Sequence, residues 1–320
     1  TNTGSGGWSH NAFRRSGFLS LLPYFEQAPL WDQIAAGDPT GTTAGGNVVS
    51  PEGPRGWYGW SVWNPTPASL MCPSDEGNGG SNTRTHSYAF SKGDQINTIR
   101  DDQTVRGIFS YARCTKIADI LDGTSNTVMM SERLCQRDMN SGGQGGVSAA
   151  AGAIEHVKAL ATPPSSGMVN NPQLCYGVSD GKYLLAGTNY WGRFGRAWTD
   201  GQPAYVGFNT VLPPNAPACA TRGTWGDQQD LVIPPASRHP GGVNVLFADG
   251  SVDFVSETID TGNLAVGPGE VIEFFNGAEI SRGGKTIVAF TSRNREGSSN
   301  ILISVDEYPN HLGQNHSVDL

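Results

Sequence analysis

Hydrophobic and polar residues alternate most clearly in the segment GVNVLFADGSVDFVS, in the last third of the chain. Val243, Val245 and Phe247 occupy every second position, so we expect their side chains on one face of a strand. After a short interruption, Val252 and Phe254 resume the alternation, and we expect them on the same inward face. The pattern predicts a β-hairpin.

The interruption is the pair Asp249-Gly250. Both central positions of a type I′ turn need φ > 0, and an Asp-Gly pair meets that need. We therefore predict a two-residue turn at this point. Gly241 and Gly242, just before the hairpin, allow the backbone to bend or to approach another segment closely.

A helical pattern occupies the segment SGFLSLLPYFEQAPLWDQIAAG near the N-terminus, where apolar residues recur three and four positions apart. Pro23 and Pro29 interrupt it. The pattern predicts two short helices, with Ser16 as the N-cap and Gly37 near the last stop. Elsewhere, Val128–Met130 and the runs EVIEFF, KTIVAF and NILISV are typical of strands.

The composition favours strands, turns and ordered loops over a helical bundle. The 320 residues include 43 Gly and 20 Pro, and charged residues are 16% of the chain, against about 25% in typical domains. Eight Trp, nine Tyr and twelve Phe can still build a packed core. We therefore expect an α+β fold in which an antiparallel β-sheet is combined with short helices and long loops.

The charge pattern argues against a nucleic-acid partner. The net charge is −8 and no run of Lys or Arg occurs, whereas phosphate binding needs clustered cations. No apolar run approaches the roughly 18–20 residues that span a bilayer. The chain has neither an initiator Met nor a signal peptide, so we expect any targeting segment to lie upstream.

The five cysteines are widely spaced and none belongs to a C-x-x-C motif. This argues against a zinc ribbon or a thioredoxin-like site. In a Gly-rich, Lys-poor chain the spacing fits an exported protein with one or two disulfides, and an odd count leaves one thiol over. Cys175 and Cys219, each in a loop-like setting, are the candidate pair. The alternative is that several cysteines are buried free thiols.

Two other groups of residues are candidate ligand sites. Trp57, Trp60 and Trp63 lie close together and could form a sugar platform or a partner anchor, although such clusters more often belong to a core. Asp249 and Asp253 are candidates for a calcium site, which the acidic composition would suit. The alternative for Asp249 is a purely turn-forming role.

His239 and Asp249 invite comparison with a catalytic or metal-binding pair, but the hairpin separates them. Nine intervening residues span about 20–30 Å at ~3.3 Å per residue. We therefore expect His239 to bond a backbone group or a carboxylate elsewhere. Phosphate-loop, G-x-G-x-x-G, G-x-S-x-G and H-E-x-x-H motifs are absent from the sequence, and we predict that the protein is not an enzyme.

A histidine followed by nine residues and Asp-Gly resembles the signature of the prepilin-like H-X9-DG proteins abundant in planctomycetes, also described as DUF1559. Four further segments resemble the family in the same order: GFLSLLPYFEQAPLWDQI, LMCPSD, IADILDGTSNTVMMSE and GFNTVLPPNAPAC. The resemblance covers about residues 13–265. The matching signature residues are His239, Pro240, Gly241, Gly242, Asn244, Asp249, Gly250 and Ser251.

The resemblance implies an exported α+β globular head similar to type IV pilins and type II secretion pseudopilins. We expect a pilin-like domain at residues 1–265 and a strand-rich extension at residues 266–320. The basic leader and the apolar N-terminal helix usual in such proteins are not in this sequence, and we expect them either to have been cleaved off or to lie upstream. The family implies no activity or certain cofactor, with calcium as a side hypothesis because type II pseudopilins are known for a calcium site.

Two functional hypotheses follow. The first is a non-catalytic structural subunit of an extracellular or cell-surface filament or lattice, which assembles with like subunits or with other pilin-like proteins. The alternative is a surface module that binds polysaccharide through aromatic loops, motivated by the tryptophan cluster and the aromatic stretch at residues 190–208.

Overall fold

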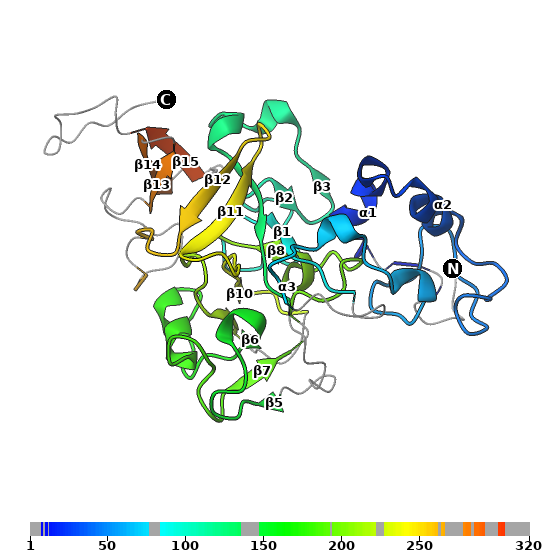
Figure 1. The fold of residues 1–320 in the computed structure, drawn as a ribbon, viewed down its shortest axis with the longest axis horizontal. Coiled ribbons are helices and arrows are strands. Elements are labelled where there is room, and N and C mark those ends of the chain that lie inside the picture. The colour runs from blue at the N-terminus through cyan, green and yellow to red at the C-terminus, as the bar shows by residue number, and fades with distance from the viewer. Residues whose placement is uncertain are drawn as a thin grey trace, which may run out of the picture.

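The computed structural model describes residues 13–76, 84–135, 147–192, 194–221 and 227–261, together with residues 8, 10, 11, 264 and 265 and three strands nearer the C-terminus. Within these residues the fold is α+β, as the composition predicts. It combines two five-stranded sheets with short helices (Figure 1).

The N-terminal segment forms the short helices that its hydrophobic spacing predicts. They are α1 (Gly17–Leu21), the 3₁₀ helix η1 (Leu22–Phe25) and α2 (Ala28–Ala36). The Ser16 hydroxyl accepts a hydrogen bond from the Phe18 amide at 3.2 Å and caps α1. Pro23 and Pro29 each lie in the first turn of a helix, where a missing N–H costs nothing. Gly37 follows α2 with φ of 73°.

The first sheet carries the predicted hairpin. In spatial order its strands are β12 (Val252–Ser256), β11 (Gly242–Phe247), β4 (Val128–Glu132), β1 (Tyr88–Ser91) and β8 (Gly207–Phe208). The strands β12, β11, β4 and β1 pair antiparallel, and β8 runs parallel to β1. Val243, Val245 and Phe247 are buried on one face of β11, as the alternation predicts.

The turn of the hairpin is longer than the sequence pattern predicts. The Phe247 amide donates to the Ser251 carbonyl at 2.9 Å, so Ala248, Asp249 and Gly250 form a three-residue loop. Of these three residues only Gly250 has positive φ, 88°. The two-residue type I′ turn is therefore wrong, and the loop matches the three-residue type that ends in a left-handed glycine.

The longer loop also changes which face β12 presents. Leu246 pairs with Val252 and Asn244 with Phe254, so each pair shares a face opposite to the buried one. Val252 and Phe254 are 59% and 44% exposed, whereas Val255 is buried. The predicted inward orientation of Val252 and Phe254 is wrong because one additional loop residue shifts the pairing by one position.

A disulfide bond joins the second sheet to a neighbouring 3₁₀ helix. The strands of this sheet, in order, are β10 (Leu231–Val232), β9 (Ala218–Ala220), β6 (Leu160–Ala161), β7 (Asn189–Trp191) and β5 (Val147–Ser148). Cys219 of β9 is bonded to Cys175 of the 3₁₀ helix η7 (Pro172–Val178), with 5.9 Å between the Cα atoms. This confirms the candidate pair. Cys72 and Cys135 are thiols.

The remaining elements outside the two large sheets are short. They are η2 (Ser61–Trp63), η3 (Ala68–Leu70), η4 (Ile117–Asp119), η5 (Thr124–Asn126), η6 (His156–Lys158), α3 (Pro203–Val206) and the two-stranded pair β2 (Phe109–Ser110) with β3 (Arg113–Cys114). No helix in the described part of the chain has the length and hydropathy of a membrane span.

Three strands near the C-terminus form a separate antiparallel sheet. They are β13 (Ala278–Arg282), β14 (Lys285–Thr291) and β15 (Asn300–Ser304). The runs KTIVAF and NILISV are confirmed as strands, while EVIEFF lies outside the described residues. The division of the chain at residue 265 stays a prediction.

The tryptophan cluster belongs mainly to the core. Trp60 and Trp63 are fully buried, with ring centroids 4.8 Å apart, and Trp198 packs edge-on against Trp63. Trp57 is 39% exposed, and the Arg14 guanidinium lies over its ring. An exposed platform made of Trp57, Trp60 and Trp63 is therefore wrong, because interior packing has withdrawn two of the rings from solvent.

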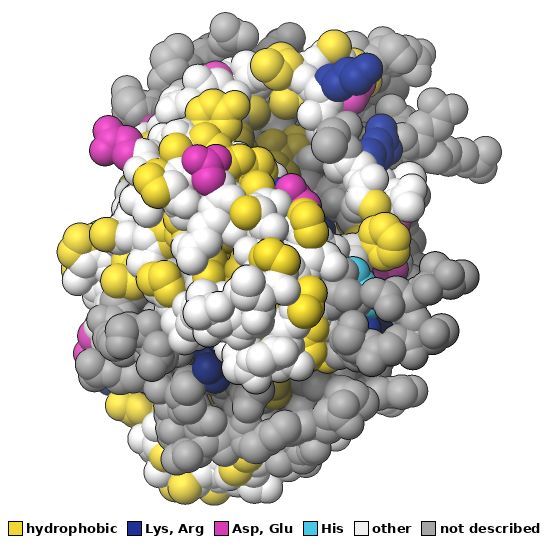
Figure 2. Space-filling model, turned by 90° about the vertical axis from the view of Figure 1, so that its right-hand side faces the viewer, with side chains coloured by type: hydrophobic (Ala, Val, Ile, Leu, Met, Phe, Trp, Pro, Cys, Tyr) yellow, Lys and Arg dark blue, Asp and Glu magenta, His cyan; other side chains and the backbone are white. Residues whose placement is uncertain are grey.

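The aromatic stretch at residues 190–208 is also interior. Its described aromatic side chains are buried, namely Tyr190, Trp191, Phe194, Trp198, Tyr205 and Phe208. Figure 2 shows a face on which hydrophobic side chains are spread among polar atoms, with few charged groups. The described aromatic residues of this stretch therefore build the interior.

A buried histidine makes the stability of the fold sensitive to acid. His86 is fully buried against Phe18, and its Nδ1 lies 2.7 Å from the Tyr88 carbonyl. Burial, reinforced by the charge of Arg133, lowers the pKa of His86 to about 3. In the unfolded chain His86 takes up a proton near pH 6.5. The contribution of neutral His86 to the free energy of unfolding is therefore complete above pH 6.5 and is lost as the pH falls toward 3.

We expect the free energy of unfolding to decrease with falling pH from about 6.5, by about 1.4 kcal/mol per pH unit for this one proton. His86→Asn should remove that part of the slope in denaturant titrations between pH 4 and 7. Phe18→Leu is the control, because it weakens packing against the same ring and keeps the titrating group. Equal slopes in wild type and His86→Asn would contradict the assignment.

Candidate functional site

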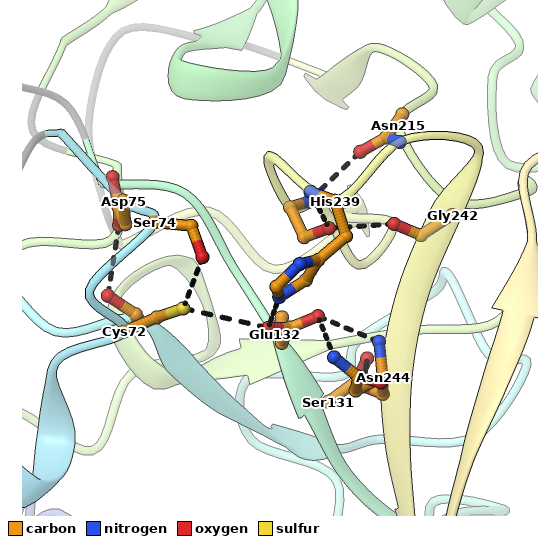
Figure 3. A network of polar contacts seen from close by, with 11 residues as sticks. Cys72, Ser74, Asp75, Ser131, Glu132, Asn215, His239, Gly242 and Asn244 are labelled. Carbon is orange, nitrogen blue, oxygen red and sulfur yellow. Dashed lines mark hydrogen bonds and ion pairs between the residues drawn. The ribbon is translucent and has the colours of Figure 1, made fainter.

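His239, the first residue of the H-X9-DG pattern, contacts a buried carboxylate. Its Nε2 lies 2.9 Å from Oε1 of Glu132, the last residue of β4 (Figure 3). The Glu132 side chain is 6% exposed and that of His239 33%. The expectation that His239 bonds a backbone group or a carboxylate elsewhere is therefore confirmed.

The second oxygen of Glu132 is held by β11. Oε2 accepts hydrogen bonds from the Asn244 amide at 2.7 Å and from Asn244 Nδ2 at 3.2 Å. The neighbouring Ser131 hydroxyl donates to the Asn244 carbonyl at 2.9 Å. The antiparallel register, in which Ser131 pairs with Val245, brings these groups together. Two N–H donors thus fix the orientation of the carboxylate.

Cys72 approaches the same carboxylate from a third segment. It follows η3, and its Sγ lies 3.9 Å from Glu132 Oε1 and 3.2 Å from the Ser74 hydroxyl. One ligand atom each from Cys72, Glu132 and His239 lies within 4.8 Å of the other two. Among the described residues, this is the group of three that has the spacing of a metal site.

A second layer of hydrogen bonds orients the histidine. The Ser237 hydroxyl accepts from the His239 amide at 3.0 Å and donates to the Gly242 carbonyl at 2.7 Å. The Ser237 amide in turn donates to Asn215 Oδ1 at 3.0 Å. The backbone before β11 is therefore fixed independently of the His239–Glu132 contact.

Ion pairs flank this cluster on one side. Arg238 lies between Glu76 and Glu155, with Nη2 2.5 Å and 2.7 Å from their carboxylate oxygens. Lys158 Nζ is 3.5 Å from Glu76. The charges of Lys158 and Arg238 lower the pKa of Glu76. These charges compensate one another and tie the segment after Cys72 to the segment before β11.

Cys135 is a different kind of thiol. It is buried, and its Sγ and amide lie 3.3 Å and 3.2 Å from Asp75 Oδ2, which also accepts from the Ser87 hydroxyl. Burial and the nearby Asp75 charge raise the pKa of Cys135 well above its usual range. Its thiol is therefore a protonated hydrogen-bond donor, and nucleophilic chemistry needs the thiolate.

Asp249, one of the two candidate calcium ligands, shapes the hairpin loop. Its Oδ1 accepts from the Ser251 amide at 2.9 Å and from the Ser251 hydroxyl at 2.6 Å. Its own amide donates to the Thr124 carbonyl at 3.1 Å. Asp253 lies on β12 opposite Val245. The turn-forming interpretation therefore accounts for Asp249, and neither aspartate belongs to the three-residue cluster.

A separate surface hollow of about 500 Å³ is lined by His156 and Ser179, among other residues. His156 Nδ1 lies 2.5 Å from the Ser179 hydroxyl, and Nε2 lies 2.9 Å from the Asn215 carbonyl. The same hydroxyl is 3.0 Å from both the Tyr183 carbonyl and the Gly181 amide. These contacts match a serine that closes a local turn, and burial lowers the pKa of His156.

Comparison with known families agrees with the sequence pattern. The chain matches, over residues 1–262, the model of a family described as a protein of unknown function, DUF1559. The chain belongs to this family. A model of the acetyl-CoA hydrolase/transferase C-terminal domain matches residues 245–320, less than a quarter of the chain. No curated protein and no solved structure matches.

The structure gives the signature of this DUF1559 protein a physical meaning. His239 and Asn244 converge on Glu132, while Asp249 and Gly250 form the loop at the other end of β11. The Gly242 backbone lies so close to β12 that a Cβ there would collide with the Val255 carbonyl. A side chain at this position is therefore excluded by the adjacent strand.

Glu132 and Cys72 are the site residues that sequence reasoning missed. Both lie in segments that resemble the family, MMSE and LMCPSD. They are separated from each other by 60 residues, and His239 is 107 residues from Glu132. The presence of Glu132 and Cys72 in these two segments indicates that the two residues matter. Their proximity depends on the order of β11, β4 and the loop after η3, which local patterns do not specify.

Glu132→Ala should lower the free energy of unfolding by about 2–4 kcal/mol, because it removes a buried carboxylate and leaves the partly buried donors of Asn244 without their acceptor. Glu257→Ala is the matched control. Glu257 is an exposed carboxylate bonded to Asn215 at 2.9 Å, and its loss should cost less than about 1 kcal/mol. Urea titrations measure both values. Similar losses in the two variants would argue against a structural role for Glu132.

Proposed function

We propose that this DUF1559 protein is a non-catalytic structural subunit of an extracellular or cell-surface assembly, a filament or lattice of pilin-like or pseudopilin-like subunits. The observation that carries the proposal is the use of the signature residues. His239, Asn244 and Asp249 direct their hydrogen bonds to β4, to η5 and to the hairpin's own loop. The signature residues therefore hold the hairpin in place, and such a purely structural use supports a structural rather than a catalytic role.

The disulfide supports export. Cys175 and Cys219 are bonded across a sequence separation of 44, and such bonds persist mainly in oxidising compartments outside the cytoplasm. The low content of Lys and Arg and the loop-rich surface agree with an extracellular location. We therefore place the proposed assembly at the cell surface.

An exposed apolar pair on an edge strand offers a contact for a neighbouring subunit. Val252 and Phe254 lie on the same face of β12, and β12 is the edge of the first sheet. Apolar residues exposed on an edge strand favour association between chains. The polysaccharide alternative has less support, because most of the aromatic residues that motivated it are buried.

Electron microscopy of native cell-surface material, labelled with an antibody against this chain, should show a repeating filament or lattice. In sedimentation of the purified protein, replacing Val252 and Phe254 by Lys should reduce the assembled fraction at least about tenfold, because the interface would have to bury two charges. Leu185→Lys is the control, since Leu185 is exposed to a similar extent, 43%, at another position.

Labelled material that contains only dispersed particles would contradict the proposal. So would equal sedimentation of the wild type and the double Lys variant, combined with an absence of order in the native material. Loss of assembly in Leu185→Lys alone would indicate that the subunits contact one another around Leu185 and not at β12.

A further inference from the structure

The cluster of Cys72, Glu132 and His239 has the composition of a transition-metal site. A thiol, a carboxylate and an imidazole meet from three segments that are distant in the chain (Figure 3). A thiolate ligand selects against calcium and magnesium, which take oxygen ligands. Zinc accepts all three ligand types. The chemistry of the donors therefore points to zinc or a closely similar divalent ion.

Two of the three distances between the donor atoms are close to those of a zinc tetrahedron, and the third lies within 4.8 Å. Metal–ligand bonds of 2.0–2.3 Å hold tetrahedral N, O and S donors about 3.3–3.6 Å apart. Here His239 Nε2 is 2.9 Å from Glu132 Oε1, and Cys72 Sγ is 3.9 Å from the same oxygen. His239 and Glu132 would have to move slightly apart, and Cys72 and Glu132 slightly closer together, to reach the separation that zinc requires.

The surrounding hydrogen bonds already orient the donors. Both N–H groups of Asn244 bind Oε2 of Glu132, so Oε1 remains directed at His239 and Cys72. Ser237 holds the His239 amide, and the Asp75 amide donates to the Cys72 carbonyl at 3.0 Å. Outer contacts of this kind fix ligand geometry and raise the affinity of metal sites.

Charge balance and access also suit a divalent cation. A Cys72 thiolate and the Glu132 carboxylate carry two negative charges, which a divalent ion neutralises in a largely buried position. The nearby charges of Arg238, Lys158 and Glu76 are paired with one another. His239 is one-third exposed, so solvent reaches the site and can supply a fourth ligand.

We propose that Cys72, Glu132 and His239 bind one zinc-type divalent metal ion through Sγ, Oε1 and Nε2, with a fourth coordination position open to water. Binding converts the Cys72 thiol to a thiolate and releases its proton to solvent. The proton that His239 Nε2 shares with Glu132 must also leave this nitrogen, so the bound imidazole is the neutral form with its proton on Nδ1. The ion joins the loop after η3, the end of β4 and the segment before β11. This site is independent of whether the protein assembles.

Cobalt(II) is the probe, because its complexes with thiolates give a charge-transfer absorption band. This band disappears when Zn²⁺ replaces Co²⁺. Purified protein is stripped with a chelator and titrated with Co²⁺ under nitrogen. We expect one equivalent to produce the band, an excess of Zn²⁺ to abolish it, and Zn²⁺ but not Ca²⁺ to raise the melting temperature. Binding should strengthen as the pH rises, because the thiol must lose its proton.

Cys72→Ser should lose the charge-transfer band, and His239→Gln should weaken binding at least about tenfold. Cys135→Ser is the matched control, since Cys135 is a second thiol next to a carboxylate in the described part of the chain, and it should keep the band. Circular dichroism verifies that each variant is folded. Wild-type protein without the band and without a zinc-dependent melting shift would overturn the proposal, as would a band that survives Cys72→Ser or disappears in Cys135→Ser.

Discussion

A carboxylate withdrawn from water must be matched by donors or it carries a large desolvation cost, and Glu132 imposes this constraint on the hairpin sheet. Its donors are the Asn244 amide, the Asn244 side chain and His239. A slip of β11 by one residue along β4 would remove Asn244 from the carboxylate and turn Val243 and Val245 out of the interior. Polar pairing and apolar burial thus select the same register.

Local features of the fold could be predicted from sequence because they depend on neighbours in the chain. The Ser16 cap, the break at the two prolines and the alternation in β11 are of this kind. The hairpin turn shows where local pattern fails. Ala248 fits either the end of a strand or the start of a loop, and this one choice decides whether Val252 and Phe254 face the core or solvent.

Long-range contacts decide the rest of the site and of the core. Trp60 and Trp63 are close to Trp57 in sequence, yet both are buried, because Trp60 packs against Trp63 and Trp63 packs against Trp198, far along the chain. In the same way, the sequence predicts that His239 has a hydrogen-bonding partner but not that the partner is Glu132. Identifying it requires β11 to lie beside β4, which precedes it by more than a hundred residues.

The nine residues between His239 and Asp249-Gly250 set the length of β11, which must match the length of the segment that anchors both of its ends. At one end of β11, His239 and Asn244 contact Glu132, where β4 ends. At the other end, the amides of Ala248 and Asp249 donate to the carbonyls of Thr127 and Thr124, just before β4 begins. A single segment, residues 124–132, therefore holds both ends of β11. Insertion or deletion between the two anchors would leave one end unattached, because antiparallel strands must match in length to meet at both.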